Sequence, residues 1–105
     1  MTALERLAAT IEARRGADPG ASWTAKLMAK GPEYCARKFG EEAVEAVIEA
    51  TRGDPARLAA EAADVLYHLL VMCAARGVTL AQIEAELARR EGTSGLAEKA
   101  ARPPG

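Results

Sequence analysis

The residues of this 105-residue chain best suited to chemistry are carboxylates on two consecutive segments. In a helix, which turns by about 100° per residue, five charged side chains of the first segment share one arc of about 100°. They are Lys38, Glu41, Glu42, Glu45 and Glu49. Taken alone, this pattern is typical of an amphipathic helix with a solvated acidic face.

The second segment carries its charges on a narrower stripe, within an arc of about 60°. Its members are Arg57, Glu61, Asp64 and His68. The other residues from 57 to 75 are almost all apolar on every side of the helix, which is typical of a buried helix. Carboxylates three residues apart repel each other, and both the repulsion and the desolvation cost grow in partly buried surroundings. Selection for folding alone would favour Gln or Ala at Glu61 or Asp64.

Only Gly53 and Asp54 separate these two segments, so an antiparallel helical hairpin is predicted. Counting outward from the turn places their acidic residues at similar heights, with Glu42 opposite the region of Asp64. Four or five carboxylates that converge in a groove need a counter-cation. Oxygen ligands alone favour Mg²⁺, whereas no EF-hand loop is present to favour Ca²⁺. A solvated acidic hairpin is the structural alternative.

The composition predicts an all-α fold, since 25 alanines stand against five valines and three isoleucines. Capping residues, glycines and prolines divide the chain into about five helices, with the antiparallel hairpin at the centre. They run from Thr2 to about Arg15, from Ser22 to Gly31, from Pro32 to Arg52, from Pro55 to Arg76 and from Thr79 to about Gly92. Residues 1–94 therefore form a single domain, and residues 95–105 are expected to be a flexible tail.

Charge and cysteine content exclude several classes of protein. With 14 basic and 15 acidic residues, the net charge of −1 gives no electrostatic reason for a nucleic-acid or acidic-membrane partner. The longest run without a charge, residues 65–75, is much shorter than the ~20 residues of a spanning helix, and no signal peptide is apparent. Cys35 and Cys73 lie far apart and His68 is the one histidine, which argues against disulfides and zinc and favours the cytoplasm.

These motifs resemble those of the all-α nucleoside-triphosphate pyrophosphohydrolases, in which EExxE on one helix faces ExxD on the next. The closest resemblance is to the phosphoribosyl-ATP pyrophosphohydrolase family. Residues 22–27 (SWTAKL) resemble its S-Y-T-A-[KR]-L segment, with Trp23 in place of Tyr. Residues 38–45 (KFGEEAVE) resemble K-x-G-E-E-x-x-E, and residues 61–71 (EAADVLYHLLV) resemble E-x-[AS]-D-x-x-Y-H-L-L-V. The resemblance covers residues 4 to 91.

The resemblance implies hydrolysis of phosphoribosyl-ATP to phosphoribosyl-AMP and pyrophosphate with Mg²⁺, the second step of histidine biosynthesis. The chain resembles the stand-alone form of the family. Many relatives are fused to a cyclohydrolase domain, and 105 residues are too few to include one. The implied metal ligands are Glu42, Glu45, Glu61 and Asp64. Glu41 is then the residue that orients or deprotonates the attacking water, although Glu41 and Glu42 could exchange these roles.

Five further residues are candidates for contact with the nucleotide substrate: Lys38, Lys26, Lys30, Thr24 and His68. Lys38 would meet a phosphate or the leaving group, and its alternative is a helical ion pair with Glu42. Lys26 and Lys30 would form a positively charged surface that binds the triphosphate, or they would stay solvated. His68 would bind a carboxylate or substrate, or serve the structure alone. Gly40, inside a helix, indicates a close approach by another helix or by substrate.

One hairpin with flanking helices gives a thin core for this much apolar surface. The helix from Pro55 is therefore expected to pack against a second copy, giving a homodimer assembled as a helical bundle, in agreement with the family resemblance. Two other functions remain open. One is a housekeeping (d)NTP pyrophosphohydrolase with the same metal site, and the other is a non-catalytic helical dimerisation module.

Overall fold

In a computed structural model, the described residues, 1–92 and 95–103, form six helices and no strand. The helices are α1 (Ala3–Ala13), α2 (Trp23–Ala29), α3 (Pro32–Arg52), α4 (Pro55–Ala75), α5 (Leu80–Arg89) and α6 (Gly95–Ala101). The predicted all-α class is confirmed, and five of the helices begin at or within a residue of their predicted capping positions. The predicted end of the domain at residue 94 lies outside the described residues.

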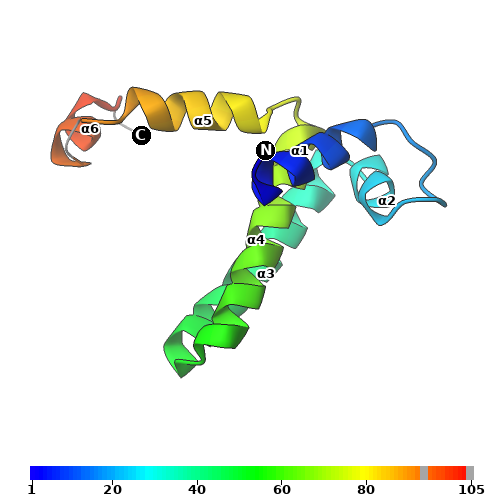
Figure 1. The fold of residues 1–105 in the computed structure, drawn as a ribbon, viewed down its shortest axis with the longest axis horizontal. Coiled ribbons are helices and arrows are strands. Elements are labelled where there is room, and N and C mark those ends of the chain that lie inside the picture. Colours follow the sequence, from blue (N-terminus) through cyan, green and yellow to red (C-terminus); the bar gives the residue numbers. More distant parts are fainter. Residues whose placement is uncertain (93–94, 104–105) are drawn as a thin grey trace.

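Two residues make the turn between α3 and α4. Gly53 ends α3 in the left-handed region with φ 80°, which glycine adopts without the steric cost of a side chain. The Asp54 carboxylate then accepts hydrogen bonds from the backbone N–H groups of Ala56 and Arg57, at 3.1 and 3.4 Å, and so caps α4. Because the connection is this short, α3 and α4 pack side by side as the predicted antiparallel hairpin (Figure 1).

The apolar core lies at the end of the hairpin away from this turn, where α1 and α2 cross it (Figure 1). The backbone there is held in part by Arg15, whose guanidinium donates to the Ala74 carbonyl. From this body α5 extends away to one side and leads to α6 (Figure 1). The buried residues of the core are Ile11, Leu27, Cys35, Leu70, Val71 and Ala74.

Much of the hairpin lies outside this core. The radius of gyration is 15.7 Å, whereas a compact chain of this length has about 13 Å. The buried residues of α4 all belong to its second half, from His68 onward. On the hairpin, Val44, Val47 and Leu66 are exposed to 58%, 62% and 43%. In a single chain, therefore, α4 is buried as predicted only in the half that lies near the core.

Two features of local structure were not anticipated. Residues 95–101 form α6, a sixth helix beyond the five predicted, while the flexibility of residues 95–105 stays a prediction; the alanines of α6 favour a helix even though no apolar face is present for burial. At Gly40, no other helix of the described chain comes close, since nothing lies within 4 Å of a Cβ built there. The space beside Gly40 therefore remains available to substrate or to a second copy.

By length and composition alone, α4 is long and apolar enough to cross a membrane, with 21 residues and a mean hydropathy of 1.5. The same features are found in the central helix of a soluble protein. Two carboxylates on α4, Glu61 and Asp64, interact electrostatically with acidic residues of α3, and ionised carboxylates are costly in hydrocarbon. This polar face favours packing against α3 over insertion into lipid.

Candidate metal centre

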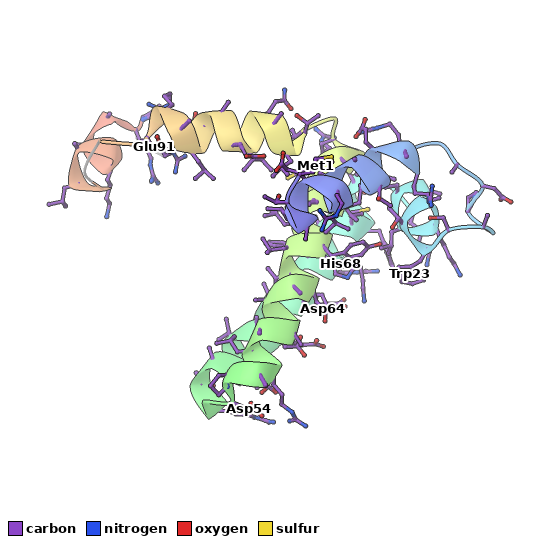
Figure 2. The ribbon with its side chains drawn as sticks, viewed as in Figure 1. Met1, Trp23, Asp54, Asp64, His68 and Glu91 are labelled. Atoms are coloured by element: carbon purple, nitrogen blue, oxygen red, sulfur yellow. The ribbon has the colours of Figure 1, made fainter. Side chains whose placement is uncertain are left out.

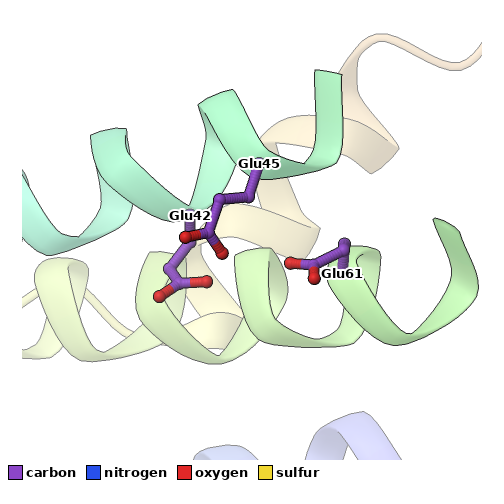
Figure 3. Close-up of side chains that lie close together, drawn as sticks. All are labelled: Glu42, Glu45 and Glu61. Atoms are coloured by element: carbon purple, nitrogen blue, oxygen red, sulfur yellow. The ribbon is translucent and has the colours of Figure 1, made fainter. Parts of the chain in front are cut away.

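Three carboxylates meet between the two helices of the hairpin (Figure 3). Glu42 and Glu45 lie three residues apart on α3 and therefore on one face, and Glu61 projects toward them from α4. One oxygen from each side chain lies within 4.8 Å of the others. Three of the four residues predicted as ligands are thus brought together by the pairing of α3 with α4.

Burial, and then the like charges around them, raise the pKa of two of these acids. Burial contributes most to the raised pKa of Glu61, followed by the charges of Glu45, Asp64 and Glu49. Burial also contributes most to the raised pKa of Glu42, followed by Glu45 and Asp64, while the nearby Lys38 acts in the opposite direction. A pKa raised by like charges means that the ionised cluster repels itself and would be stabilised by a cation.

An unpaired oxygen on each helix supports the same conclusion. The Oε2 atoms of Glu49 and Glu61 are buried and have no hydrogen-bond partner within residues 1–92 and 95–103. Leaving a buried acceptor unpaired is costly unless another group satisfies it. Opposite oxygens around Mg²⁺ lie about 4.2 Å apart, close to the 4.8 Å spread of the cluster. The donor set therefore fits a hard divalent cation.

Asp64 and Glu41 occupy different positions relative to this cluster. Asp64 is exposed, but it is close enough to raise the pKa of both Glu42 and Glu61. Glu41 is also exposed, and its carboxylate forms an ion pair with Lys38 at 3.5 Å. Of these two neighbouring residues, Glu42 is thus the one whose carboxylate lies in the acidic cluster, while Glu41 lies outside it and pairs with Lys38.

Lys38 and His68 lie at the same end of the cluster. Lys38 pairs with Glu41 rather than with Glu42, the partner that helical spacing suggested, although its charge still reaches Glu42. The His68 side chain is buried, with Nε2 4.0 Å from Oε1 of Glu42. Burial, and then the charge of Lys38, lowers the pKa of His68 against an opposing effect of Asp64. The imidazole is therefore neutral at pH 7 and does not form an ion pair with Glu42.

The three candidate residues on α2 have other partners. The Thr24 hydroxyl is 2.6 Å from the Tyr67 hydroxyl, so it links α2 to α4. The Lys26 ammonium lies 5.8 Å from the centre of the Trp23 ring, and that of Lys30 lies 4.5 Å from the centre of the Tyr34 ring. The Lys26 contact stays within α2, whereas Thr24 reaches Tyr67 on α4 and Lys30 reaches Tyr34 on α3.

Sequence reasoning gave no role in the site to Glu49 or Tyr67. Glu49 lies on the same arc as Glu42 and Glu45, so helical spacing alone was a sufficient signal for it. Tyr67 packs edge-on against His68, with ring centres 5.0 Å apart, while its hydroxyl meets Thr24. No motif indicates that contact, because it depends on how α2 packs against α4.

The raised pKa values predict how pH acts on the metal-free protein. Glu42 and Glu61 hold protons more tightly in the folded chain, so their contribution to the free energy of unfolding is full below about pH 4.5 and is lost as pH rises. We expect the metal-free stability of the parent to fall relative to a Glu61→Gln variant between pH 4.5 and 7, measured by urea unfolding in EDTA. A divalent cation should reduce this difference.

Comparison with Glu61→Gln isolates the carboxylates from other titrating groups. His68 has a lowered pKa, so its contribution rises with pH as it loses its proton, but it is present in both proteins. Glu86, with a pKa of about 2, changes charge below this range. A parent that gains stability over Glu61→Gln as pH rises would contradict the proposed repulsion.

Comparison with known proteins gives one consistent family. A family model described as phosphoribosyl-ATP pyrophosphohydrolase matches residues 4–91. Three similar proteins, each named phosphoribosyl-ATP pyrophosphatase, are full-length matches. The one from Cereibacter sphaeroides (strain ATCC 17025 / ATH 2.4.3) is 78% identical over 97% of this chain and 99% of its own length. Those from Jannaschia sp. (strain CCS1) and Ruegeria pomeroyi (strain ATCC 700808 / DSM 15171 / DSS-3) are 72% and 70% identical, over 97% and 100% of this chain and 100% of their own lengths.

Proposed function

Because the chain belongs to the phosphoribosyl-ATP pyrophosphohydrolase family, we propose that it hydrolyses phosphoribosyl-ATP to phosphoribosyl-AMP and pyrophosphate, in histidine biosynthesis. In this reaction water attacks the triphosphate, the bond between its α and β phosphates breaks, and pyrophosphate leaves. The observation that carries the proposal is the meeting of Glu42, Glu45 and Glu61, all at positions of the family's acidic motifs, between α3 and α4.

We assign the metal ligands to Glu42, Glu45, Glu61 and Asp64. The first three are supported by the 4.8 Å spread of their oxygens, and Asp64 by its electrostatic effect on two of them. When bound there, Mg²⁺ would neutralise phosphate oxygens and lower the pKa of a coordinated water. Glu49, with its unpaired buried oxygen, would keep the electrostatic potential of the groove negative on the side of the turn.

We propose that Glu41 orients or deprotonates the attacking water. Its carboxylate is exposed and lies outside the cluster, next in sequence to the ligand Glu42, so it has capacity to accept a hydrogen bond from water. Lys38 holds Glu41 at 3.5 Å and presents a positive charge beside the site. That ammonium would meet a phosphate oxygen or the leaving pyrophosphate, whose negative charge grows as the bond breaks.

The substrate contacts on α2 and α4 divide into two kinds. Lys26 and Lys30 carry exposed ammonium groups that would attract the triphosphate. Thr24 is half-buried and bonded to Tyr67, so it would hold α2 against α4 in the position that substrate binding requires. His68 is buried beside Tyr67 on α4 and would keep the Tyr67 ring in place for that contact. Of these four residues, the two lysines are thus the ones we expect to meet phosphate directly.

We further propose that the protein is a homodimer in the cytoplasm. The exposed Val44 and Val47 of α3 and Leu66 of α4 lie on the part of the hairpin that the core leaves uncovered. A second copy packed along this hairpin would cover them and complete a helical bundle. Burial of α4 in such a bundle would also account for its hydropathy without a membrane.

The reaction is tested by measuring pyrophosphate release from phosphoribosyl-ATP and from the four dNTPs, each with MgCl2 and with EDTA. We expect kcat/KM for phosphoribosyl-ATP to exceed that for any dNTP by at least about 100-fold, and EDTA to abolish release. Equal or better turnover of a dNTP would indicate a housekeeping pyrophosphohydrolase instead. No metal-dependent release from any of these nucleotides would refute the proposed activity.

A further inference from the structure

The side chain of Trp23, the one tryptophan of the chain, is 56% exposed at the start of α2. Tryptophan is highly buried on average, so an indole this exposed in the body of a domain calls for a partner. It borders an open hollow of about 490 Å³ that is also lined by Pro19, Gly20, Ala21, Ser22 and Lys26. Apart from Trp23 and Lys26, the residues that line this hollow have small side chains or none.

Charge accompanies this aromatic surface. Lys26 follows Trp23 by three residues and Lys30 by seven, which places all three on one face of α2 and its C-terminal cap. The Lys26 ammonium lies 5.8 Å from the indole centre. Exposed aromatic rings next to cationic groups are the elements with which proteins bind nucleotides, since a base stacks on the ring and the phosphates meet the cations.

The packing of α2 brings its first turn close to the part of α4 that carries Asp64. Thr24, next to Trp23, hydrogen-bonds Tyr67, and Tyr67 lies three residues after Asp64 on the same side of α4. Figure 2 shows Trp23 and Asp64 on the same side of the hairpin in this view. The start of α2, where Trp23 lies, is therefore held against α4 about one turn from Asp64, which neighbours the acidic cluster.

We propose that the purine base of the nucleotide substrate stacks on Trp23, with Lys26 beside its phosphates, an inference that rests on the proposed function. Stacking on an indole fixes the plane of the base without requiring a particular hydrogen-bonding pattern. The triphosphate then extends from α2 toward the carboxylates of the hairpin. Trp23 is thereby a substrate-binding residue that sets affinity, and it takes no part in bond breaking.

The single tryptophan makes the proposal directly measurable, because its fluorescence reports on Trp23 alone. ATP added to the protein with MgCl2 should quench this emission saturably. Inorganic tripolyphosphate should compete with ATP without quenching, since it has the phosphates but no base. Binding of ATP, measured by calorimetry, with no change in emission would overturn the proposal.

Variants separate stacking from a structural role. Trp23→Ala should weaken ATP binding and raise KM for phosphoribosyl-ATP by roughly 5- to 100-fold, with a much smaller effect on kcat. Trp23→Tyr should recover most of this loss, because it keeps an aromatic face. Lys26→Met should raise KM as well, whereas Lys99→Met on α6 should not. Unchanged KM in Trp23→Ala, or a loss that accompanies a change from dimer to monomer, would refute the proposal.

The outcomes also distinguish this inference from the proposed function. Hydrolysis of phosphoribosyl-ATP with an unaltered KM in Trp23→Ala would refute the stacking and leave the activity standing. Saturable quenching by ATP without any hydrolysis of phosphoribosyl-ATP would support the stacking and refute the proposed activity.

Discussion

Replacing Glu45 by Gln is expected to lower kcat for pyrophosphate release by at least about 100-fold while the fold persists. The charge of Glu45 raises the pKa of both Glu42 and Glu61, so Glu45 interacts with a proposed ligand on each helix. The amide keeps the shape of the side chain and removes the negative charge that would hold the cation. Rates of pyrophosphate release in saturating MgCl2 measure the loss, and circular dichroism monitors the helices.

The same substitution should have the opposite effect on metal-free stability. Without a cation the acids repel one another, and Gln removes one of the repelling charges, so Glu45→Gln should unfold at a higher temperature than the parent in EDTA. Asp64→Asn should behave in the same way. Glu84→Gln on α5, the matched control outside the cluster, should leave both rate and melting temperature nearly unchanged. Turnover retained in both Glu45→Gln and Asp64→Asn would refute the ligand assignment.

The helices of this chain could be predicted from the sequence because their ends are marked by local chemistry. Gly53 permits the left-handed conformation that ends α3, and the Asp54 side chain caps α4, so the hairpin follows from a few residues around the turn. Helical spacing then fixes which side chains share a face. For this reason Glu42, Glu45 and Glu61 were predicted as neighbours from residue numbers alone, and the structure brings them together.

The partners of individual side chains were less predictable, because they depend on contacts between helices. Spacing allows Lys38 to pair with Glu41 or Glu42, and the rotamer it adopts in the structure brings it to Glu41. The sequence makes Thr24 a candidate for substrate contact, whereas the packing of α2 places its hydroxyl against Tyr67. The helix α6 was missed because no apolar face accompanies its alanines, and apolar periodicity was the main signal used.

A single copy of the chain does not explain why the first half of α4 is apolar and yet exposed. Its second half is covered by α1 and α2, whereas Leu66 and the alanines before it stay exposed. Burying apolar surface stabilises a protein by about 25 cal/mol per Å², so an uncovered apolar stripe of this length favours association. The open space beside Gly40, on the same side of α3 as Val44 and Val47, would admit the backbone of a neighbouring helix closely.

Introducing a charge at Leu66 therefore tests the dimer with a large expected effect. Leu66 is 43% exposed in one chain, and a lysine there would be unpaired and desolvated if a second copy covers it. We expect Leu66→Lys to weaken dimerisation by at least about 100-fold, measured by sedimentation equilibrium, since an unpaired buried charge costs several kcal/mol. Leu96→Lys on α6, where the leucine is 84% exposed, is the matched control and should dimerise normally. A Leu66→Lys protein that dimerises as tightly as the parent would place the interface elsewhere, and a monomeric parent would refute the dimer itself.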